Sequence, residues 1–323
     1  MSRHRSLPLR RTASSHPAAD HPSGPARVSR RAVLTSGLGL TALGLAGCAA
    51  DDDTVTVENR RVESAADDLL PSETSAAPVT DGPPLITGSF DSAHMGGRPT
   101  RWAVARPTGV TGTLPVVVVL HALTTNEHTI FSSQLGIQKV LQTYVDAGNA
   151  PFAIAAVDGA ANYWHARTDG TDGGAMVLDE FIPMLGSNPD LDLSVDRIGL
   201  FGWSMGGYGA LRLGALLGAP RVTAIAVSSP ALWADPRNFP ARAFDGFDDY
   251  QRNSLFGQQD AFRRIPLMIS IGSSDQFFTY TRQWVAGVHP PPVFSTGPGG
   301  HTNRYWRGVL PDQVEFLGRN LAR

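Results

Sequence analysis

Residues 197–217 read RIGLFGWSMGGYGALRLGALL, and this stretch indicates the fold more clearly than any other part of the chain. A short apolar run leads into the pentapeptide GWSMG at 202–206, and a second apolar run, 208–217, follows it. Strand, Gly-x-Ser-x-Gly and helix in this order form a sharp turn that exposes a serine hydroxyl at the end of the strand. We therefore expect Ser204 to be a nucleophile; the alternative is a glycine-rich turn with an idle serine.

The rest of the C-terminal part alternates short apolar runs with longer amphipathic segments. The run LPVVVVL at 114–120 is typical of a strand that is buried on both faces of a parallel sheet. Further strands, the first of them antiparallel, are expected at 102–105, 152–157, 197–201, 222–227, 266–271 and 292–295. Helices are expected at 134–147, 175–185, 208–217 and 307–321. This alternation predicts an α/β fold with a mostly parallel central sheet and helices on both faces.

The catalytic partners of a serine in this kind of turn follow it in the chain, first Asp or Glu and then His. Two histidines, His289 and His301, come after Ser204. His289 precedes the last expected strand, whereas His301 follows it and so falls at the carboxyl edge of the sheet, where Ser204 is also expected. Asp275 comes just after the strand 266–271. We expect Asp275 to be the acid and His301 the base; ordinary loop roles are the alternative for each.

Several segments together resemble the "Putative esterase" family of α/β-hydrolases, which includes esterase D, feruloyl esterases, enterochelin esterases and mycobacterial mycolyltransferases. The segments that carry the resemblance are Leu120-His121-Ala122-Leu123, the run GWSMGGYGA at 202–210, Asp275, His301 and Tyr305-Trp306. The resemblance covers about residues 86–321 and implies the α/β-hydrolase fold with Ser204, Asp275 and His301 as nucleophile, acid and base. It also implies that hydrolysis and acyl transfer share one site.

An oxyanion hole is expected next to the nucleophile. One donor should be the backbone N–H of the residue after the nucleophile, Met205. The other should come from the loop after the strand 114–120, and the family resemblance implies the N–H of Leu123. Many relatives have glycine at the position of Ala122. The sequence departs from the family here, and this difference bears on the conformation of the oxyanion loop.

Two further candidates lie after the strand 152–157. Trp164 and His165 are placed to line a substrate pocket, although packing is an equal alternative for aromatic residues there. His121 and His128 are not at metal-ligand spacing with any acid or cysteine. The expected chemistry requires no metal and no organic cofactor.

The N-terminal 47 residues have the features of an export signal. Arg30 and Arg31 precede an apolar run, 32–47, that is shorter than the ~20 residues needed to span a bilayer. Paired arginines before such a run indicate the twin-arginine export route. The run ends in Leu-Ala-Gly before Cys48, the single cysteine of the chain, and this ending resembles the lipobox of bacterial lipoproteins. We expect export and a lipid anchor on Cys48 at the outer face of the cell membrane; an ordinary secretory signal is the alternative.

Composition divides the remaining chain into a tether and one domain. Residues 48–83 are rich in Asp, Ser, Thr, Ala and Pro without periodicity, which is typical of a flexible tether. Residues 84–323 are uniform in character and predict a single domain. Seven of the 27 basic residues and one of the 29 acidic residues lie in 1–47, so the mature chain holds 20 basic and 28 acidic residues. This negative balance argues against nucleic acid as a partner.

Three functions fit these observations. The first is an extracytoplasmic serine esterase that hydrolyses carboxylic esters through an acyl-enzyme on Ser204, with a small-molecule, lipid or glycan ester as substrate. The second is an acyltransferase that moves an acyl chain to a cell-envelope sugar. The third is a non-catalytic envelope lipoprotein that uses the same fold to bind a ligand. The ordered set of Ser204, Asp275 and His301 favours the two catalytic functions over the third.

Overall fold

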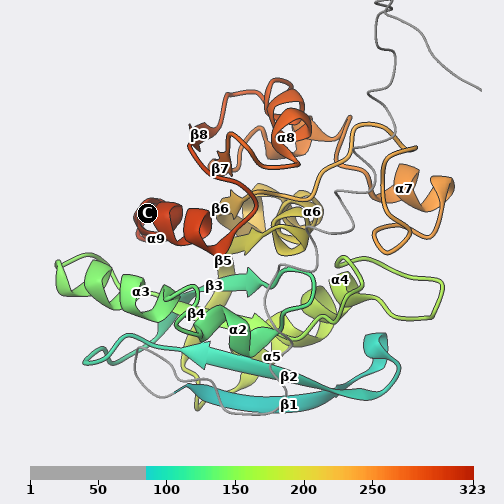
Figure 1. Ribbon diagram of the computed structural model, residues 1–323. Coiled ribbons are helices and arrows are strands. Elements are labelled where there is room, and N and C mark those ends of the chain that lie inside the picture. Colours follow the sequence, from blue (N-terminus) through green and yellow to red (C-terminus); the bar gives the residue numbers. More distant parts are fainter. Residues whose placement is uncertain (1–84) are drawn as a thin grey trace, which may run out of the picture. The chain divides into compact units, whose positions relative to one another are not determined.

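The computed structural model describes residues 85–323. The expected signal segment 1–47, the lipidation residue Cys48 and the tether 48–83 lie outside the described residues. In the described part, eight strands form one sheet in the order β1-β2-β4-β3-β5-β6-β7-β8 (Figure 1). The strands are β1 (Ile86–Ser92), β2 (Arg98–Ala105), β3 (Leu114–Leu120), β4 (Ala153–Val157), β5 (Leu193–Trp203), β6 (Val222–Ser228), β7 (Leu267–Gly272) and β8 (Val293–Gly297).

The sheet is parallel from β4 to β8, and β2 runs antiparallel to both β1 and β4. The expected antiparallel start is therefore confirmed, and with it the mostly parallel sheet. The edge strand β1 was not expected, because it has few large apolar residues and alternates half-buried with exposed positions. It pairs with β2 over its whole length, and Ile86 and Phe90 pack against the core.

Helices cover both faces of this sheet. The helical segments are η1 (Ala93–Met95), α2 (Glu127–Phe131), α3 (Ile137–Asp146), α4 (Gly173–Ala175), η2 (Met176–Phe181), α5 (Ile182–Ser187), α6 (Met205–Arg221), α7 (Phe247–Asn253), η3 (Gln259–Phe262), α8 (Phe278–Val285) and α9 (Asn303–Leu321). Buried side chains of α3 and α9 join one core, and those of α5 and α6 join the other. Figure 1 shows the ribbons of these helices beside the strands of the sheet.

Strand β3 shows how the sheet divides the two cores. Val116, Val118 and Leu120 belong to the core under α6, whereas Val117 and Val119 belong to the core under α3 and α9. Successive side chains of a strand point to opposite faces, so a continuous apolar run serves both cores. Burial of each such side chain contributes about 1.5–3 kcal/mol. This explains why the run LPVVVVL predicts its strand so well.

All four expected helices differ from the observed bounds, since α6 and α9 begin before 208 and 307, and the other two differ for local reasons. The helix expected at 134–147 begins at Ile137, because Gly136 adopts a left-handed φ of 71° just before it. The segment expected as one helix at 175–185 contains the π-helical turn η2 and continues as α5, where Pro183 is the second residue. Proline has no N–H to give to the preceding turn, so a regular α-helix is not maintained across this point. No helix within residues 85–323 combines the length and apolar character that crossing a membrane requires.

Candidate active site

Ser204 occupies a strained turn between β5 and α6. Its φ and ψ angles are 55° and −122°, a left-handed conformation that is rare outside glycine. The turn is possible because its flanks carry no side chains. A Cβ atom at Gly206 would lie 1.9 Å from the carbonyl oxygen of Leu120, and one at Gly202 would lie 2.3 Å from the carbonyl oxygen of Gly206. The two glycines therefore let helix α6 start directly against strand β3 and hold the serine above the sheet.

The imidazole of His301 contacts Ser204 on one side and Asp275 on the other. Its Nε2 atom is 2.8 Å from Ser204 Oγ, and its Nδ1 atom is 3.0 Å from Asp275 Oδ2. An ionised carboxylate only accepts hydrogen bonds, so Nδ1 carries the proton and Nε2 is left as the acceptor for the serine hydroxyl. The rings of Phe277 and Trp306 pack edge-on against the imidazole at centroid distances of 5.3 and 5.0 Å. These contacts restrict its orientation.

Asp275 follows β7 and is almost fully buried, with 5% of its surface exposed. Its Oδ1 atom accepts a 2.9 Å hydrogen bond from the backbone N–H of Phe277. Burial by itself raises the pKa of Asp275, but the charge and hydrogen bond of His301, the Phe277 N–H and the Ser229 hydroxyl together hold this pKa below its usual value. Asp275 is therefore ionised at neutral pH despite its burial.

The loops that carry the acid and the base are hydrogen-bonded to each other. The backbone N–H groups of Ser273 and Ser274 donate to the carbonyl oxygens of Gly297 and Gly299 at 2.8 and 2.9 Å. A Cβ atom at Gly272 would lie 2.3 Å from the Gly299 carbonyl oxygen, so this close approach requires glycine. The two loops thus form one rigid support for the Asp275–His301 pair.

The two expected oxyanion donors lie on adjoining elements. Met205 is the first residue of α6, so its N–H has no partner within the helix. Leu123 lies in the loop after β3, and the end of β3 packs against the start of α6 at Gly206. The structure therefore brings both backbone segments to the edge of the sheet where Ser204 lies.

His121 fixes the peptide unit that contains the Leu123 N–H. Its Nδ1 atom lies 2.8 Å from the carbonyl oxygen of Ala122, and its Nε2 atom accepts a 2.9 Å hydrogen bond from the N–H of Gly159. Because Nε2 accepts, Nδ1 must be the protonated nitrogen, and it donates to Ala122. The carbonyl of Ala122 and the N–H of Leu123 belong to one planar peptide, so holding one sets the direction of the other. Burial lowers the pKa of His121 and keeps the ring neutral.

Trp164 and His165, the two expected pocket residues, are fully buried. The ring nitrogens of His165 lie 3.0 and 2.9 Å from the carbonyl oxygens of Ala166 and Ala243, and its ring stacks on Phe244. A Cβ atom at Gly209 in α6 would meet the indole of Trp164 at 2.4 Å. These contacts favour the packing role for both residues over direct contact with a substrate.

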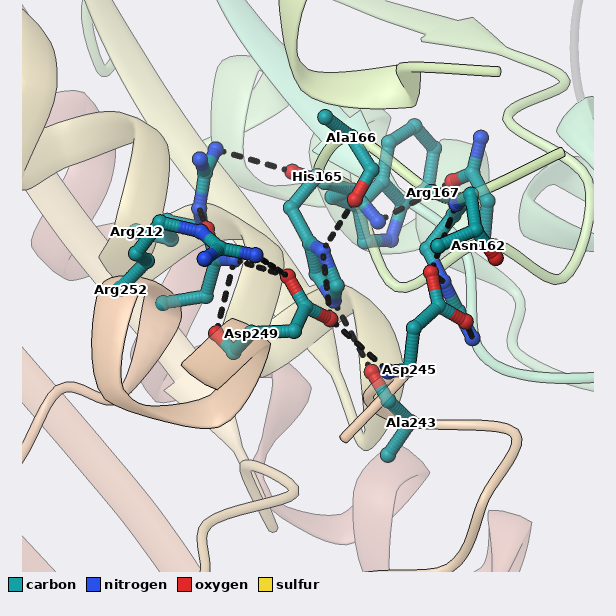
Figure 2. A network of polar contacts seen from close by, with 12 residues as sticks. Asn162, His165, Ala166, Arg167, Arg212, Ala243, Asp245, Asp249 and Arg252 are labelled. Carbon is teal, nitrogen blue, oxygen red and sulfur yellow. Dashed lines mark hydrogen bonds and ion pairs between the residues drawn. The ribbon is translucent and has the colours of Figure 1, made fainter. Parts of the chain in front are cut away.

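A polar network around His165 joins the segment 160–172 to the segment 241–253 (Figure 2). Arg167 donates to both carboxylate oxygens of Asp245, at 3.1 and 2.6 Å, and also to the carbonyl oxygen of Arg242. The hydrogen bonds from Arg167 hold the pKa of Asp245 well below its usual value. The two segments follow β4 and β6, so the network connects two loops that leave the carboxyl edge of the sheet.

Three residues around His301 were not expected from the sequence as parts of the site. Phe277 and Trp306 pack on His301, and the Nε1 of Trp306 donates a 3.0 Å hydrogen bond to the Oγ of Ser229, just after β6. In the sequence, Trp306 contributed only to the family resemblance. Its position at the start of α9, five residues after His301, was the one feature that could have indicated a place in the site. Ser229 has no motif around it, and its position depends on how β6 and β7 pair.

The central sheet, the serine turn and the Ser204–His301–Asp275 arrangement define an α/β-hydrolase. Residues 92–317 match the model of the family described as "Putative esterase", and the chain belongs to this family. The protein is thus an esterase-type hydrolase. No curated protein matches its sequence.

Solved structures with the same fold are distant in sequence. A ferulic acid esterase matches with a TM-score of 0.62 and 18% identity over 73% of this chain and 97% of its own. The S-formylglutathione hydrolase of Agrobacterium tumefaciens matches with a TM-score of 0.61 and 15% identity over 73% and 94%. MPT51 of Mycobacterium tuberculosis matches with a TM-score of 0.56 and 14% identity over 74% and 100%. At these identities the likeness shows the fold.

Proposed function

We propose that the protein is a serine esterase that hydrolyses carboxylic esters through a covalent acyl-enzyme on Ser204. The observation that carries the proposal is the pair of distances at His301, 2.8 Å to Ser204 Oγ and 3.0 Å to Asp275 Oδ2. A serine hydroxyl is a weak nucleophile at neutral pH, and a neighbouring base is what activates it. The side chain of His301 is such a base, and the carboxylate of Asp275 orients it.

The reaction then has two halves. In the first, Ser204 Oγ attacks the ester carbonyl carbon, His301 Nε2 takes the hydroxyl proton, and the alcohol leaves with that proton. In the second, water attacks the acyl-enzyme, His301 again takes and returns a proton, and the carboxylic acid is released. The N–H groups of Leu123 and Met205 would stabilise the oxyanion in both halves, a contribution of about 100- to 1000-fold per donor.

We further propose that the enzyme acts outside the cytoplasm. The support is the Arg30-Arg31 pair before the apolar run 32–47 and the ending at Cys48, which fit twin-arginine export and lipid attachment. The substrate would then be a small-molecule, lipid or glycan ester that reaches the outer face of the cell membrane.

The test is a rate measurement on the purified full chain with a series of p-nitrophenyl esters of increasing acyl length. We expect hydrolysis by the wild type and a loss of at least about 1000-fold in kcat for Ser204→Ala. The same assay with a sugar acceptor distinguishes the acyltransferase, because a transferase would form the sugar ester faster than the free acid. A Ser204→Ala variant that keeps its rate, or a folded wild type that cleaves no ester, would contradict the proposal.

A further inference from the structure

A cavity of about 310 Å³ lies at the carboxyl edge of the sheet. Its lining comes from the first residue of β2, from the segment 160–171 after β4 and from the segment 242–245 after β6. Strand β2 is antiparallel to β4, so its first residue lies at the same edge of the sheet as the end of β4. Three of the lining residues, Asn162, Arg167 and Asp245, are labelled in Figure 2. The volume falls in the range of pockets that hold small molecules, about 300–1,000 Å³.

The cavity is separate from the catalytic residues, since none of the three lines it. Tyr163, which is next in the chain to a lining residue, packs against Trp233 at a centroid distance of 5.9 Å. Trp233 packs in turn against Phe277 at 5.3 Å, and Phe277 packs against His301 at 5.3 Å. All three aromatic side chains are buried. A ligand in the cavity would therefore lie outside the catalytic centre.

One wall of the cavity is an ion pair whose hydrogen bonds are made within the protein. Arg167 donates to both carboxylate oxygens of Asp245 at 3.1 and 2.6 Å, and to the carbonyl oxygen of Arg242 at 2.7 Å. The backbone N–H of Thr168 donates to the same carboxylate at 2.7 Å. The two charges of this pair balance each other, and both groups are held in place. The pair therefore shapes the cavity and leaves the recognition of a ligand to the other lining residues.

The remaining arginines of the lining have hydrogen-bond donors to spare. Arg98 donates through Nε to the carbonyl oxygen of Met95 at 3.0 Å, but its two terminal nitrogens make no hydrogen bond within residues 85–323. The guanidinium of Arg242 likewise has no partner in this part of the chain. Asp169 is the other acid, and its Oδ1 atom accepts from the N–H and the hydroxyl of Thr171 at 2.9 and 2.7 Å. The lining holds three arginines and two aspartates, so one positive charge is left over.

A buried amide adds a further donor. Asn162 is 6% exposed, and its Oδ1 atom accepts a 3.1 Å hydrogen bond from the N–H of Trp164. This bond identifies the oxygen of the amide, so the nitrogen faces the other way. Nδ2 carries two hydrogens, and its one partner among the described residues is the sulfur of Met95 at 3.5 Å, a weak acceptor. Buried polar groups are normally fully bonded, so a ligand that accepts a hydrogen bond here would complete the set.

We propose that this cavity is a second binding site, which holds a small organic anion by its carboxylate or phosphate group. The spare donors of Arg98, Arg242 and Asn162 require a ligand that accepts hydrogen bonds, and the surplus positive charge favours a negative one. Planar guanidinium groups bind carboxylates and phosphates through two parallel hydrogen bonds. The cavity is much larger than a single inorganic ion, so the uncharged part of the ligand would fill the space beside Ala160 and Ala161. The site goes beyond the proposed esterase reaction, because it contains none of the residues of that reaction.

The test is isothermal titration calorimetry of the full chain with glucose, glucuronate and glucose 6-phosphate. These probes share one sugar ring and differ in the group attached to it, so they distinguish a carboxylate from a phosphate and both from a neutral ligand. We expect at least one anionic sugar to bind with a Kd of about 1 mM or lower, and glucose to bind at least about 10-fold more weakly. Low salt is used, because the Debye length is then about 30 Å and the charges are weakly screened.

Arg98→Ala and Arg242→Ala should each weaken the binding of the anionic sugar about 10- to 100-fold, because each removes a charged donor. Both side chains are exposed, so both variants should fold. Arg264→Ala is the matched control, since it removes an exposed arginine that precedes β7 and does not line the cavity. Binding by this variant should stay within about twofold of the wild type.

The proposal is overturned if neither anionic sugar binds at ~10 mM, ten times the expected limit, or if glucose binds as tightly as they do. It is also overturned if Arg264→Ala weakens binding as much as Arg242→Ala. Ser204→Ala should bind the anion as the wild type does, and loss of binding in that variant would place the anion in the catalytic centre instead. A wild type that binds the anion but cleaves no ester would refute the proposed function alone, which separates the two failures.

Discussion

The Nε2 atom of His301 lies 2.8 Å from the Oγ atom of Ser204, although 97 positions of the chain separate the two residues. Strand β5, which leads into Ser204, is three strands away from β8, which precedes His301. At ~4.8 Å per strand, the strands themselves are about 14 Å apart. The loop after β8 must therefore return across β7 and β6, and its hydrogen bonds to Ser273 and Ser274 at the end of β7 guide it there. The same crossing brings His301 to Asp275.

The first prediction concerns the acid. Asp275→Asn should preserve the fold and lower kcat about 10⁴-fold, because an amide at this position no longer holds His301 in the tautomer that accepts the serine proton. The measurement is kcat with a p-nitrophenyl ester, together with circular dichroism as a check on folding. Near-normal activity in Asp275→Asn, with loss of activity in a variant of Asp248 or Asp249 instead, would place the acid elsewhere.

The second prediction concerns stability at mildly acidic pH. Burial lowers the pKa of both His121 and His165 in the folded protein. As the pH falls below the unfolded value of about 6.5, the unfolded state takes up protons before the folded state does. The free energy of unfolding should therefore decrease as the pH is lowered from 7.5 to 5.0, by up to ~1.4 kcal/mol per pH unit for each histidine. Carboxylates with lowered pKa values, such as Asp275, contribute only at lower pH.

Urea unfolding at pH 7.5, 6.0 and 5.0 measures this change. His289 is exposed, so His289→Asn should leave the pH dependence as it is in the wild type. An unfolding free energy that stays constant over this range would show that the buried histidines do not resist protonation.

The third prediction concerns the serine turn. Gly206→Ala would place a methyl group 1.9 Å from the backbone oxygen of Leu120 in β3. Because the oxygen belongs to the backbone, no change of side-chain rotamer can relieve this clash. We expect a loss of more than ~3 kcal/mol in the free energy of unfolding, or no folded protein. Gly308→Ala is the control, because its added Cβ meets nothing within 4 Å in helix α9 and should stabilise the protein by about 0.5–1 kcal/mol. Wild-type stability in Gly206→Ala would contradict the close approach.

The fourth prediction concerns the anchor. Cys48→Ala should move the protein from the membrane fraction to the soluble extract or the medium, because the lipid has no other attachment site in a chain with one cysteine. Replacing Arg30 and Arg31 by lysine should stop export by the twin-arginine route. Fractionation and immunoblotting measure both effects. Unchanged membrane association of Cys48→Ala would contradict lipid attachment at Cys48. Unchanged export of the double lysine variant would contradict the twin-arginine route.

A strand or helix of the fold was predictable where the sequence of that segment alone determines its conformation. The runs 114–120 and 222–227 became β3 and β6 almost residue for residue, because strands buried on both faces require continuous apolar sequence. The edge strand β1 and the π-helical turn η2 gave no such signal. Their conformation depends on the pairing with β2 and on the proline at the start of α5.

The catalytic residues were predictable because their positions after the strands indicate that they lie at the carboxyl edge of the sheet. Ser204, Asp275 and His301 were identifiable because each follows a strand, and the carboxyl ends of parallel strands meet at one edge. Ser229 was not, because its partners Ser270 and Trp306 reach it only through the pairing of β6 with β7 and the packing of α9. His165 follows a strand too, yet the segment 241–253 folds over it and buries it.

The most direct test of the account is the reaction of the folded wild type with a fluorophosphonate, followed by mass spectrometry of the labelled peptide. Reaction with this probe requires a serine that a neighbouring base activates. We expect one adduct, on Ser204. Ser204→Ala should take no label, and His301→Ala should react more slowly by a factor of about 1000 or more while remaining folded. A folded wild type that takes no label, or that carries it on another serine, would contradict the claim that Ser204 is the nucleophile with His301 as its base.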